Sequence, residues 1–419
     1  MPKILWMSPF SLHDSSSGAA LNCRYMLSSL VSRGFEVWAC SSFIFDAQQA
    51  AAQAFGDIKE LFKDNDSEIH SFDEQGIHYL YTRVSSCQEA DMTLSECQLF
   101  YHTFIKALKD FKPDVVMGYG TAPVVMSCFA AAKQQGISTA YMLANGSYST
   151  YLFPNIDLII TDSYAVSKLY AERDEINTVP VGAFFNIQNI TAPEHQKRYV
   201  TFINPSDYKG VAIFAKLAKL CQERMPEVKF LTVNTHQRFN EVVNKLHIKG
   251  DLNNHPYQQN DFPNVFMVDQ QVDMRSIYAI SAVILVPSLW FEAWGRVASE
   301  AVFNNIPVIA SNSGGLAEAI GGGGVLIDTP EHCQEDFYSL PTDEEIEPWF
   351  NALKVLLAEN FDQELETART RLSQDRAVNR LISALNPLIN KSQHQTLDLS
   401  ELCDQINALQ DDDLKDNGL

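Results

Sequence analysis

Short apolar runs alternate with longer stretches whose apolar residues recur every three or four positions. In the N-terminal part, the short runs predict strands, and the longer stretches predict the helices that connect them. The predicted strands are 3–7, 36–40, 114–117, 138–143 and 157–161, and the helices are 19–33, 96–109 and 124–135. Gly34 and Gly136 end two of the helices, as glycines often do. Alternating strands and helices predict an α/β fold with a parallel sheet covered on both faces.

The pattern repeats in the second half of the chain. Strands are predicted at 199–203, 229–233, 265–268, 282–286, 307–310 and 325–328, with helices at 211–223, 296–304 and 316–320. Two segments, 41–95 and 234–264, lack clear periodicity and are expected to be irregular. Ligands bind at the carboxyl ends of the strands in doubly wound domains, so two such domains predict a ligand cleft.

Length and periodicity together predict the domain organisation. A chain of 419 residues exceeds one ordinary hydrophobic core, so two domains are expected. The predicted order is an N-terminal domain, a linker with weak periodicity, a C-terminal domain, a helix and a flexible acidic tail. The boundaries are 1–185, 186–197, 198–375, 376–390 and 391–419.

Composition excludes several classes of function. The formal net charge of −21 argues against nucleic acid and against an anionic membrane surface. The eight cysteines form no C-x-x-C pair, which indicates a reduced compartment and no zinc site. No signal peptide and no apolar run of transmembrane length is seen, so we expect a soluble cytoplasmic protein. No acidic or histidine cluster suggests a metal, so no cofactor is expected.

Residues 286–300 carry the most informative chemistry. An apolar strand is followed by a loop with Glu292, and a helix that starts near Gly295 carries Glu300. A loop acid can bind sugar hydroxyls, a helix N-terminus can face a diphosphate, and a helix acid can bind ribose hydroxyls. The alternative for Glu300 is a place on an exposed helix face. Its neighbours Ala298 and Ala301 favour burial, and a buried acid needs a partner.

Other candidates also lie where a strand leads into a helix. Lys209 and Gly210 follow the strand 201–204, where a lysine can neutralise a diphosphate; an ordinary solvated lysine is the alternative. Gly18 lets backbone approach a phosphate or an acceptor, although a plain helix-entry glycine would look the same. Gly314 and Gly315 are candidates for close approach to a ligand, whereas Gly321 to Gly324 are interpreted as a turn.

The order of several short motifs carries a family resemblance. The motifs are Met274 to Ala279 before a strand, Val286-Pro-Ser, Glu292 with Glu300, Asn305 to Val308, and Ser313-Gly-Gly with Glu318. This ordered set resembles the retaining GT-B glycosyltransferases of family 4, the glycosyl transferases group 1, and the resemblance extends over nearly all of 1–330. It implies a GT-B fold, in which two Rossmann-like domains face a central cleft.

The resemblance also implies roles for individual residues. Glu292 would bind the donor sugar, Glu300 the ribose and Lys209 the diphosphate, and Glu292 and Lys209 would be the catalytic pair. The remaining implied donor contacts are Gly18, Gly210, Ala293, Trp294, Gly295, Arg296 and Gly315.

The chain departs from the family pattern at two positions. Asn204-Pro205 stands where many members have an arginine, and Arg296 is a candidate substitute. Gly118-Tyr119-Gly120 stands where many members have a histidine that approaches the donor sugar. Tyr119 is a candidate hydrogen-bond donor there. His13, in the first loop, is either a second candidate or a solvated loop histidine.

The resemblance implies a hexosyl-type glycosyltransferase that uses a nucleotide-sugar donor and retains the anomeric configuration. The acceptor, which the N-terminal domain would bind, is left open as a glycan, a small molecule, a lipid-linked molecule or a protein. Two alternatives remain at this point. One is another GT-B enzyme, either an inverting transferase or a sugar-nucleotide epimerase. The other is a non-catalytic sugar-nucleotide-binding or partner protein.

Overall fold

A computed structural model describes residues 1–63, 68–85, 88–150, 153–235, 237–271 and 273–390. The predicted acidic tail, 391–419, lies outside the described residues. Contacts divide the chain into two compact units, Met1–Phe185 with Gln374–Leu419, and Asn186–Ser373. The C-terminal helix α15 (Gln374–Ile389) therefore belongs to the first unit, although it follows the second in sequence.

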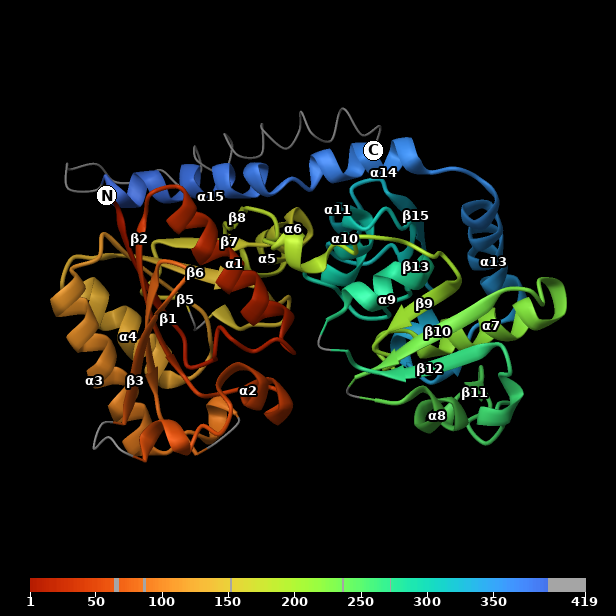
Figure 1. Cartoon of the computed structure of the whole chain (residues 1–419), viewed down its shortest axis with the longest axis horizontal. Helices are drawn as coiled ribbons and strands as arrows, with labels where there is room; N and C mark the ends of the chain where they lie inside the picture. The colour runs from red at the N-terminus through yellow and green to blue at the C-terminus, as the bar shows by residue number, and fades with distance from the viewer. Residues whose placement is uncertain (64–67, 86–87, 151–152, 236, 272, 391–419) are drawn as a thin grey trace. The chain divides into compact units, whose positions relative to one another are not determined.

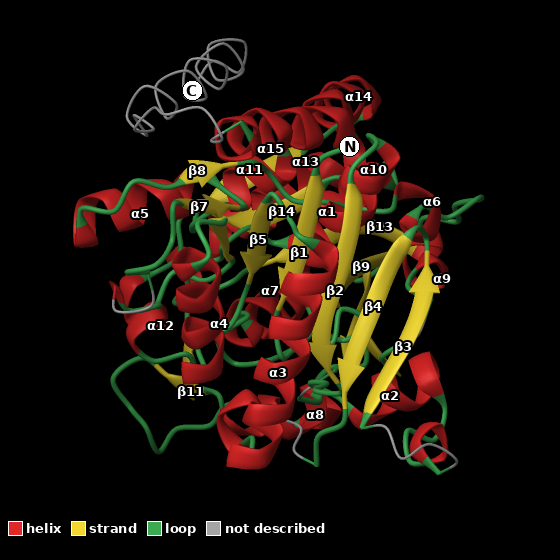
Figure 2. Cartoon of the chain, turned by 90° about the vertical axis from the view of Figure 1, so that its left-hand side faces the viewer, coloured by secondary structure: helices red, strands yellow, loops and turns green. Residues whose placement is uncertain are grey.

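The first unit is built on a sheet whose order is β3-β4-β2-β1-β5-β6-β7-β8. All neighbouring pairs are parallel except the hairpin β3–β4 (Figure 2). The strands are β1 (Lys3–Met7), β2 (Glu36–Ser42), β3 (Ile69–Glu74), β4 (Ile77–Thr82), β5 (Val115–Gly118), β6 (Ser138–Leu143), β7 (Leu158–Thr161) and β8 (Val179–Pro180).

Helices cover both faces of this sheet. Helices α3 and α4 pack on one face, and α1 packs on the other face with α15 (Figure 1). A capping box begins α3, because Thr93 accepts from the Glu96 amide while the Glu96 carboxylate accepts from the Thr93 amide. The helices are α1 (Gly18–Ser32), α2 (Gln48–Phe55), α3 (Leu94–Phe111), α4 (Pro123–Gln134) and α5 (Tyr164–Asp174), with short 3₁₀ turns at Glu60–Phe62 and Glu89–Asp91.

The hairpin β3–β4 corrects the expectation that 41–95 is irregular. Gln75 (φ 51°) and Gly76 (φ 77°) form its two-residue turn, and Glu74 pairs with Ile77. Positive φ at both turn residues matches the twist of a tight hairpin. The hairpin places Glu74 at the outer edge of the sheet, where it becomes part of the site described below.

The second unit is a parallel sheet of order β12-β10-β9-β13-β14-β15. Its strands are β9 (Tyr199–Ile203), β10 (Lys229–Asn234), β12 (Val265–Asp269), β13 (Ser281–Val286), β14 (Val308–Ser311) and β15 (Gly324–Ile327), and β11 (His247–Ile248) pairs separately with β16 (Ser339–Leu340).

The helices of the second unit follow its strands. They are α6 (Ile187–Ile190), α7 (Val211–Arg224), α8 (Phe239–Val242), α9 (Arg275–Ile280), α10 (Arg296–Phe303), α11 (Leu316–Ile320), α12 (Glu331–Glu335), α13 (Asp343–Ala358) and α14 (Asp362–Arg371), with 3₁₀ turns at Val243–Lys245 and Gln259–Asp261. Helix α7 leads from β9 to β10 and α10 leads from β13 to β14, so both helices begin at the carboxyl edge of the sheet. The predicted α/β class with two doubly wound units is confirmed.

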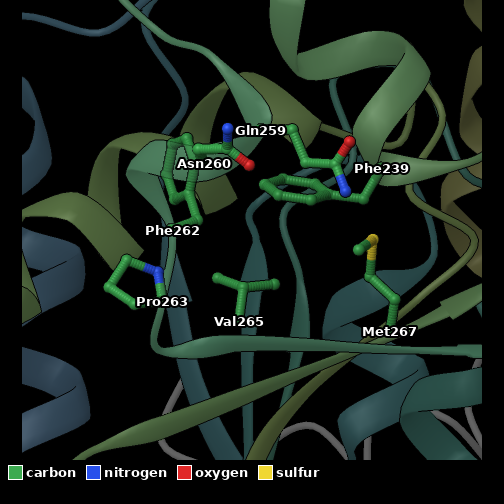
Figure 3. Close-up of a pocket in the computed structure, with 7 residues that line it drawn as sticks. All are labelled: Phe239, Gln259, Asn260, Phe262, Pro263, Val265 and Met267. Carbon is green, nitrogen blue, oxygen red and sulfur yellow. The ribbon is translucent and has the colours of Figure 1, made fainter.

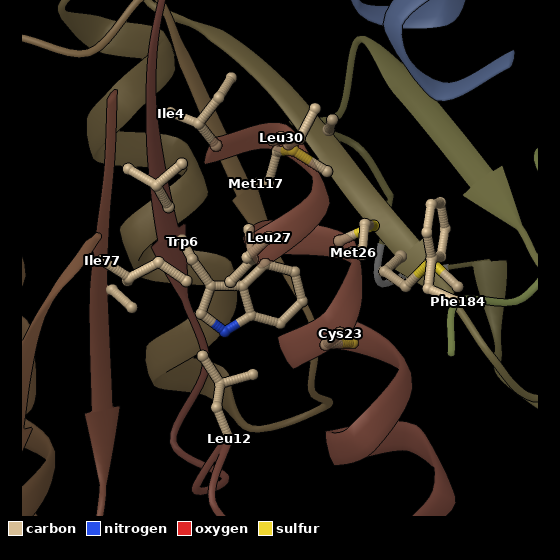
Figure 4. Packing of buried hydrophobic residues seen from close by; sticks show 14 of the residues in the cluster. Ile4, Trp6, Leu12, Cys23, Met26, Leu27, Leu30, Ile77, Met117 and Phe184 are labelled. Carbon is tan, nitrogen blue, oxygen red and sulfur yellow. The ribbon is translucent and has the colours of Figure 1, made fainter. Parts of the chain in front are cut away.

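Each unit has its own hydrophobic core. In the first unit, Ile4 and Trp6 of β1 pack against Met26, Leu27 and Leu30 of α1, and all five are fully buried (Figure 4). In the second unit, β9 and β10 share a core with α7 and α13. Burial of this kind is the main stabilising contribution to each unit. The cores also fix the loops that leave the carboxyl ends of the strands.

Candidate functional site

The central contact of the candidate site joins two loops of the second unit. Lys209 precedes α7 and Glu292 precedes α10, and the strands before them, β9 and β13, are parallel neighbours. The Lys209 Nζ lies 2.5 Å from Glu292 Oε1, and Ser288 Oγ donates to the same oxygen at 2.6 Å. The two side chains are 24% and 9% exposed. Lys209 is thus an ion-paired lysine rather than an ordinary solvated one.

Gly210 allows the two loops to approach closely. It caps α7 with φ 88°, and a Cβ there would lie 1.8 Å from the carbonyl oxygen of Pro287. The Leu289 amide also donates to the carbonyl of Tyr208 at 2.9 Å. A side chain at Gly210 would therefore separate the loop that carries Lys209 from the loop that carries Glu292.

Gly314 and Gly315 support the Glu292 loop from the opposite side. The Gly315 amide donates to the carbonyl of Glu292 at 2.8 Å, and a Cβ on Gly314 would lie 2.1 Å from that same oxygen. The N–H of Gly315 is therefore already used within the protein. This hydrogen bond holds the Glu292 backbone in place.

Glu300 lies one helix turn into α10 and has two partners. Tyr278 Oη donates to Glu300 Oε2 at 2.7 Å, and Arg296 Nη2 lies 3.5 Å from Oε1. The Glu300 side chain is 13% exposed, so the alternative of an exposed helix face is wrong. Burial, reinforced by the Glu300 charge, raises the pKa of Tyr278 well above its usual value, so the phenol stays protonated and donates. Arg296 is paired with Glu300 in this structure.

The backbone between Glu292 and α10 makes a tight entry into the helix. Gly295 has φ 97°, and a Cβ there would lie 2.4 Å from Leu316 Cδ2. The Trp294 side chain is buried, and its Nε1 donates to Ser299 Oγ at 2.9 Å. The indole of Trp294 thus stabilises the fold and is not free to contact a ligand.

Two aromatic residues beside Lys209 were missed by the sequence reasoning. The Lys209 Nζ lies 5.5 Å from the ring centroid of Tyr208 and 5.8 Å from that of Trp290. The two rings are 6.0 Å apart, and Trp290 is 40% exposed. At these distances the ammonium group is attracted electrostatically by the faces of both rings. In the sequence, the position of Trp290 two residues before Glu292 is the signal that could have identified it as a site residue.

In the first unit, His13 is buried within a polar network. Its Nδ1 lies 2.7 Å from Tyr81 Oη and its Nε2 lies 2.6 Å from Glu74 Oε2, which also accepts from Arg24 at 2.7 Å. The His13 side chain is 7% exposed, so the interpretation as a solvated loop histidine is wrong. Burial, and then the nearby Arg24 charge, lowers the pKa of His13 to about 4, so the ring is neutral at pH 7.

Tyr119 and Gly18 both lie near the carboxyl end of β1. Tyr119 follows β5, accepts a hydrogen bond from Tyr148 Oη at 3.2 Å and packs against Phe10 with ring centroids 5.6 Å apart. Burial raises the pKa of Tyr119 well above its usual value. Gly18 is the first residue of α1, after Ser17. The structure therefore brings these two residues to one edge of the first unit's sheet.

Glu89 was not singled out by sequence. Its buried carboxylate accepts from the amides of Thr121 and Ala122 at the start of α4, at 3.1 and 2.8 Å. This contact fixes the segment that carries Tyr119.

A cavity of about 240 Å³ lies at the edge of the second unit (Figure 3). None of the predicted site residues lines it. It is lined by Phe239, Gln259, Asn260, Phe262, Pro263, Val265 and Met267.

Within the described ranges, no group of three or more His, Cys, Asp or Glu residues is arranged to hold a metal ion. In the same ranges no helix is both long and apolar enough to span a membrane.

Comparison with known proteins gives a family match over part of the chain and a similar fold over most of it. Residues 184–345 match the family described as Glycosyl transferases group 1. Spore coat protein SA of Bacillus subtilis (strain 168) is 28% identical over 131 residues, which are 30% of this chain and 33% of that protein. The chain thus aligns with about a third of the length of this curated relative.

Solved structures are similar over most of the chain. A glycosyltransferase from Rickettsia africae has a TM-score of 0.64 at 16% identity and covers 93% of this chain and 99% of its own. The Anabaena protein HepE, solved with UDP and glucose, has a TM-score of 0.61 at 16% identity, with 92% and 100% covered. The trehalose 6-phosphate synthase of Burkholderia multivorans has a TM-score of 0.59 at 12% identity, with 94% and 99% covered. At these identities the likeness establishes a common fold.

Proposed function

We propose that this chain transfers a hexosyl group from a nucleotide-sugar donor to an acceptor. The family match at 184–345 and the GT-B fold shared with solved glycosyltransferases support this proposal. We further propose that the anomeric configuration is retained. UDP is the proposed donor nucleotide, because HepE was solved with UDP and glucose and with UDP-glucose. The cytoplasm is the proposed location, since the six described cysteines form no disulfide.

The observation that carries the proposal is the ion pair of Lys209 with Glu292. It lies where β9 and β13 end and where α7 and α10 begin, so one cation, one carboxylate and two helix N-termini come together. Helix N-termini and a lysine favour a diphosphate, whereas a carboxylate favours sugar hydroxyls. When the donor binds, the ammonium group of Lys209 leaves the Glu292 carboxylate and pairs with phosphate oxygens. The Glu292 carboxylate can then accept hydrogen bonds from the sugar hydroxyls.

The proposed reaction depends on stabilising the leaving group. The bond between the anomeric carbon and the diphosphate oxygen breaks, and a bond from the acceptor oxygen to the same carbon forms. Negative charge then develops on the departing diphosphate, where Lys209 and the helix N-termini stabilise it. The acceptor proton passes to a phosphate oxygen of the donor, so no enzyme base is required. Glu300 would bind the ribose hydroxyls while Tyr278 and Arg296 hold its carboxylate in position.

Two substitutions test this assignment. Glu292→Gln and Lys209→Ala should each lower kcat by about 100-fold or more, the usual cost of removing one stabilising group from a transition state. Exposed residues of the same unit provide matched controls, Glu331→Gln and Lys229→Ala, which should keep wild-type turnover. Release of nucleoside diphosphate from UDP-, GDP-, ADP- and dTDP-sugars is the measurement. Wild-type rates in both site variants would refute the assignment.

A further inference from the structure

A second cavity, of about 150 Å³, lies in the first unit and is called here the β1 cavity. Its walls include Trp6 of β1, Phe10 and Ser17 of the following loop, Asp46 and Tyr119. The family resemblance already implies that the N-terminal domain binds the acceptor. We infer that this acceptor presents a neutral, hydroxyl-bearing ring, a sugar without phosphate or carboxylate, and that the β1 cavity holds it. This inference rests on the proposed glycosyltransferase function. A cavity of this volume accommodates one six-membered ring.

Trp6 supplies a hydrogen-bond donor without an acceptor in the described part of the chain. The residue is 0% exposed, and its Nε1 has no hydrogen-bond partner among the described residues. Figure 4 shows the indole nitrogen on the side of the ring that faces Leu12, which also lines the β1 cavity. A buried N–H without an acceptor is rare in folded proteins and requires an explanation. A hydroxyl or ring oxygen in the cavity would accept from this N–H.

The remaining walls combine aromatic surface with hydroxyl groups. Phe10 and Tyr119 pack at 5.6 Å with their ring planes tilted by 52°. Ser17 makes no capping bond to α1, and the Tyr119 phenol is held by Tyr148. Apolar walls with a few fixed polar groups are typical of sites for small neutral ligands. The apolar faces of a sugar ring match the aromatic surface, and its hydroxyls match the polar groups.

The charges around the β1 cavity disfavour an anion. No Lys, Arg or His is among the described residues that line it, and Asp46 contributes a carboxylate. The α1 N-terminus would favour a phosphate. However, the buried carboxylate of Asp14 already lies there and accepts from the amides of Ser16 and Asp46, at 2.9 and 2.6 Å. The Asp14 carboxylate therefore already offsets the helix dipole, and the described lining of the cavity offers no cation to a phosphate.

The loop beneath the cavity is held in one conformation. The Ser11 amide donates to the Ile44 carbonyl, and the Leu12 amide donates to Tyr81 Oη, both at 2.9 Å. His13 lies against the same tyrosine and against Glu74. A site that is rigid before binding loses little conformational entropy when the ligand arrives.

Indole N–H signals in ¹H–¹⁵N NMR spectra test the inference. The chain has five tryptophans, so ¹⁵N-indole labelling gives few signals, and Trp6→Phe identifies that of Trp6 while keeping an aromatic ring. Glucose and N-acetylglucosamine should shift the Trp6 signal saturably. Glucose 6-phosphate should bind at least about tenfold more weakly. Trp38→Phe is the control variant, in which the Trp6 response should be unchanged, because Trp38 stacks on Phe111 and does not line the cavity.

Asp46→Asn gives a second test at the cavity mouth. Removing this charge should bring the affinity for glucose 6-phosphate closer to that for glucose. Equal or tighter binding of glucose 6-phosphate by the wild-type protein would overturn the inference. So would an unmoved Trp6 signal with neutral sugars at about 100 mM, far above a millimolar Kd.

Donor turnover in the same samples separates the two proposals. Release of nucleoside diphosphate with no response of Trp6 to any neutral sugar overturns the cavity assignment and leaves the proposed function intact. A saturable Trp6 response without turnover of any donor overturns the proposed function, while sugar binding in the β1 cavity stands.

Discussion

At the scale of single residues, the sequence predicted Glu292, Glu300 and Lys209 as candidates, because each follows a strand that leads into a helix. It could not predict that Lys209 pairs with Glu292, 83 residues further along the chain. That contact depends on β9 and β13 being parallel neighbours and on Gly210 admitting the Pro287 carbonyl. The Glu300 partner Tyr278 was also not predicted, because an isolated tyrosine gives no sign of what it contacts.

His13 leads to a pH-dependent prediction. Its pKa is lowered to about 4 by burial and by Arg24, against 6.5 in the unfolded chain. Between these values the unfolded chain binds a proton that the folded chain does not, so the free energy of unfolding falls as pH falls from 6.5 to 4. The loss amounts to about 3 kcal/mol at most, since one pKa unit is worth 1.36 kcal/mol.

Urea denaturation of the full chain at pH 7.5 and at pH 5 measures this loss. His13→Gln should show a smaller decrease in the free energy of unfolding than the wild type over that interval. The exposed His102, replaced by Gln, is the control and should retain the wild-type decrease. An identical decrease in all three proteins would contradict the assignment of the pH dependence to His13.

At the scale of elements, the parallel strands and their connecting helices were predictable because their periodicity is strong. The hairpin β3–β4 was not predicted. Its strands mix histidine, serine and acids with apolar residues, and its turn is Gln75-Gly76 rather than the more familiar Asn-Gly. Because the hairpin was not predicted, Glu74 was not recognised as a partner of His13. The burial of His13 could therefore not be predicted either.

Gly210 provides the prediction at this scale. Gly210→Ala should destabilise the second unit and lower turnover, because φ is 88° and the new Cβ would meet the Pro287 carbonyl. Gly250→Ala is the matched control, since φ is 78° and no atom lies within 4 Å of its Cβ. The control should cost about 1 kcal/mol of stability through backbone strain. Gly210→Ala should cost about 2 kcal/mol more through overpacking.

Chemical denaturation measures the loss of stability in each variant. Donor turnover is measured separately, at a temperature at which both variants are folded. Gly250→Ala should turn over the donor at the wild-type rate. Equal stability and equal turnover of the two variants would show that the approach of the two loops is unimportant.

At the scale of the whole molecule, length and alternation predicted two doubly wound units, and the family match at 184–345 confirms the group 1 glycosyltransferase resemblance over that part of the chain. The sequence could not predict that α15 packs in the first unit, because the pattern of an amphipathic helix does not specify which core the helix covers. The donor nucleotide and the acceptor remain proposals, since both depend on contacts that sequence patterns do not encode.

Metal removal provides a prediction for the intact protein. In the proposed mechanism, Lys209 and the two helix N-termini offset the negative charge of the diphosphate without a divalent cation, so EDTA should leave donor turnover unchanged. The assay compares EDTA-treated protein with protein supplemented with Mg²⁺ or Mn²⁺. A loss of turnover in EDTA that either cation restores would contradict this expectation.

The most direct test of the central claim measures donor binding and donor turnover together in wild type and Glu292→Gln. The account predicts that one nucleotide sugar raises the thermal stability of both proteins, because a ligand that binds the folded state stabilises it by mass action. Only the wild type should then release nucleoside diphosphate at an appreciable rate. Wild-type turnover by Glu292→Gln, or failure of every nucleotide sugar to bind the wild type, would contradict the account.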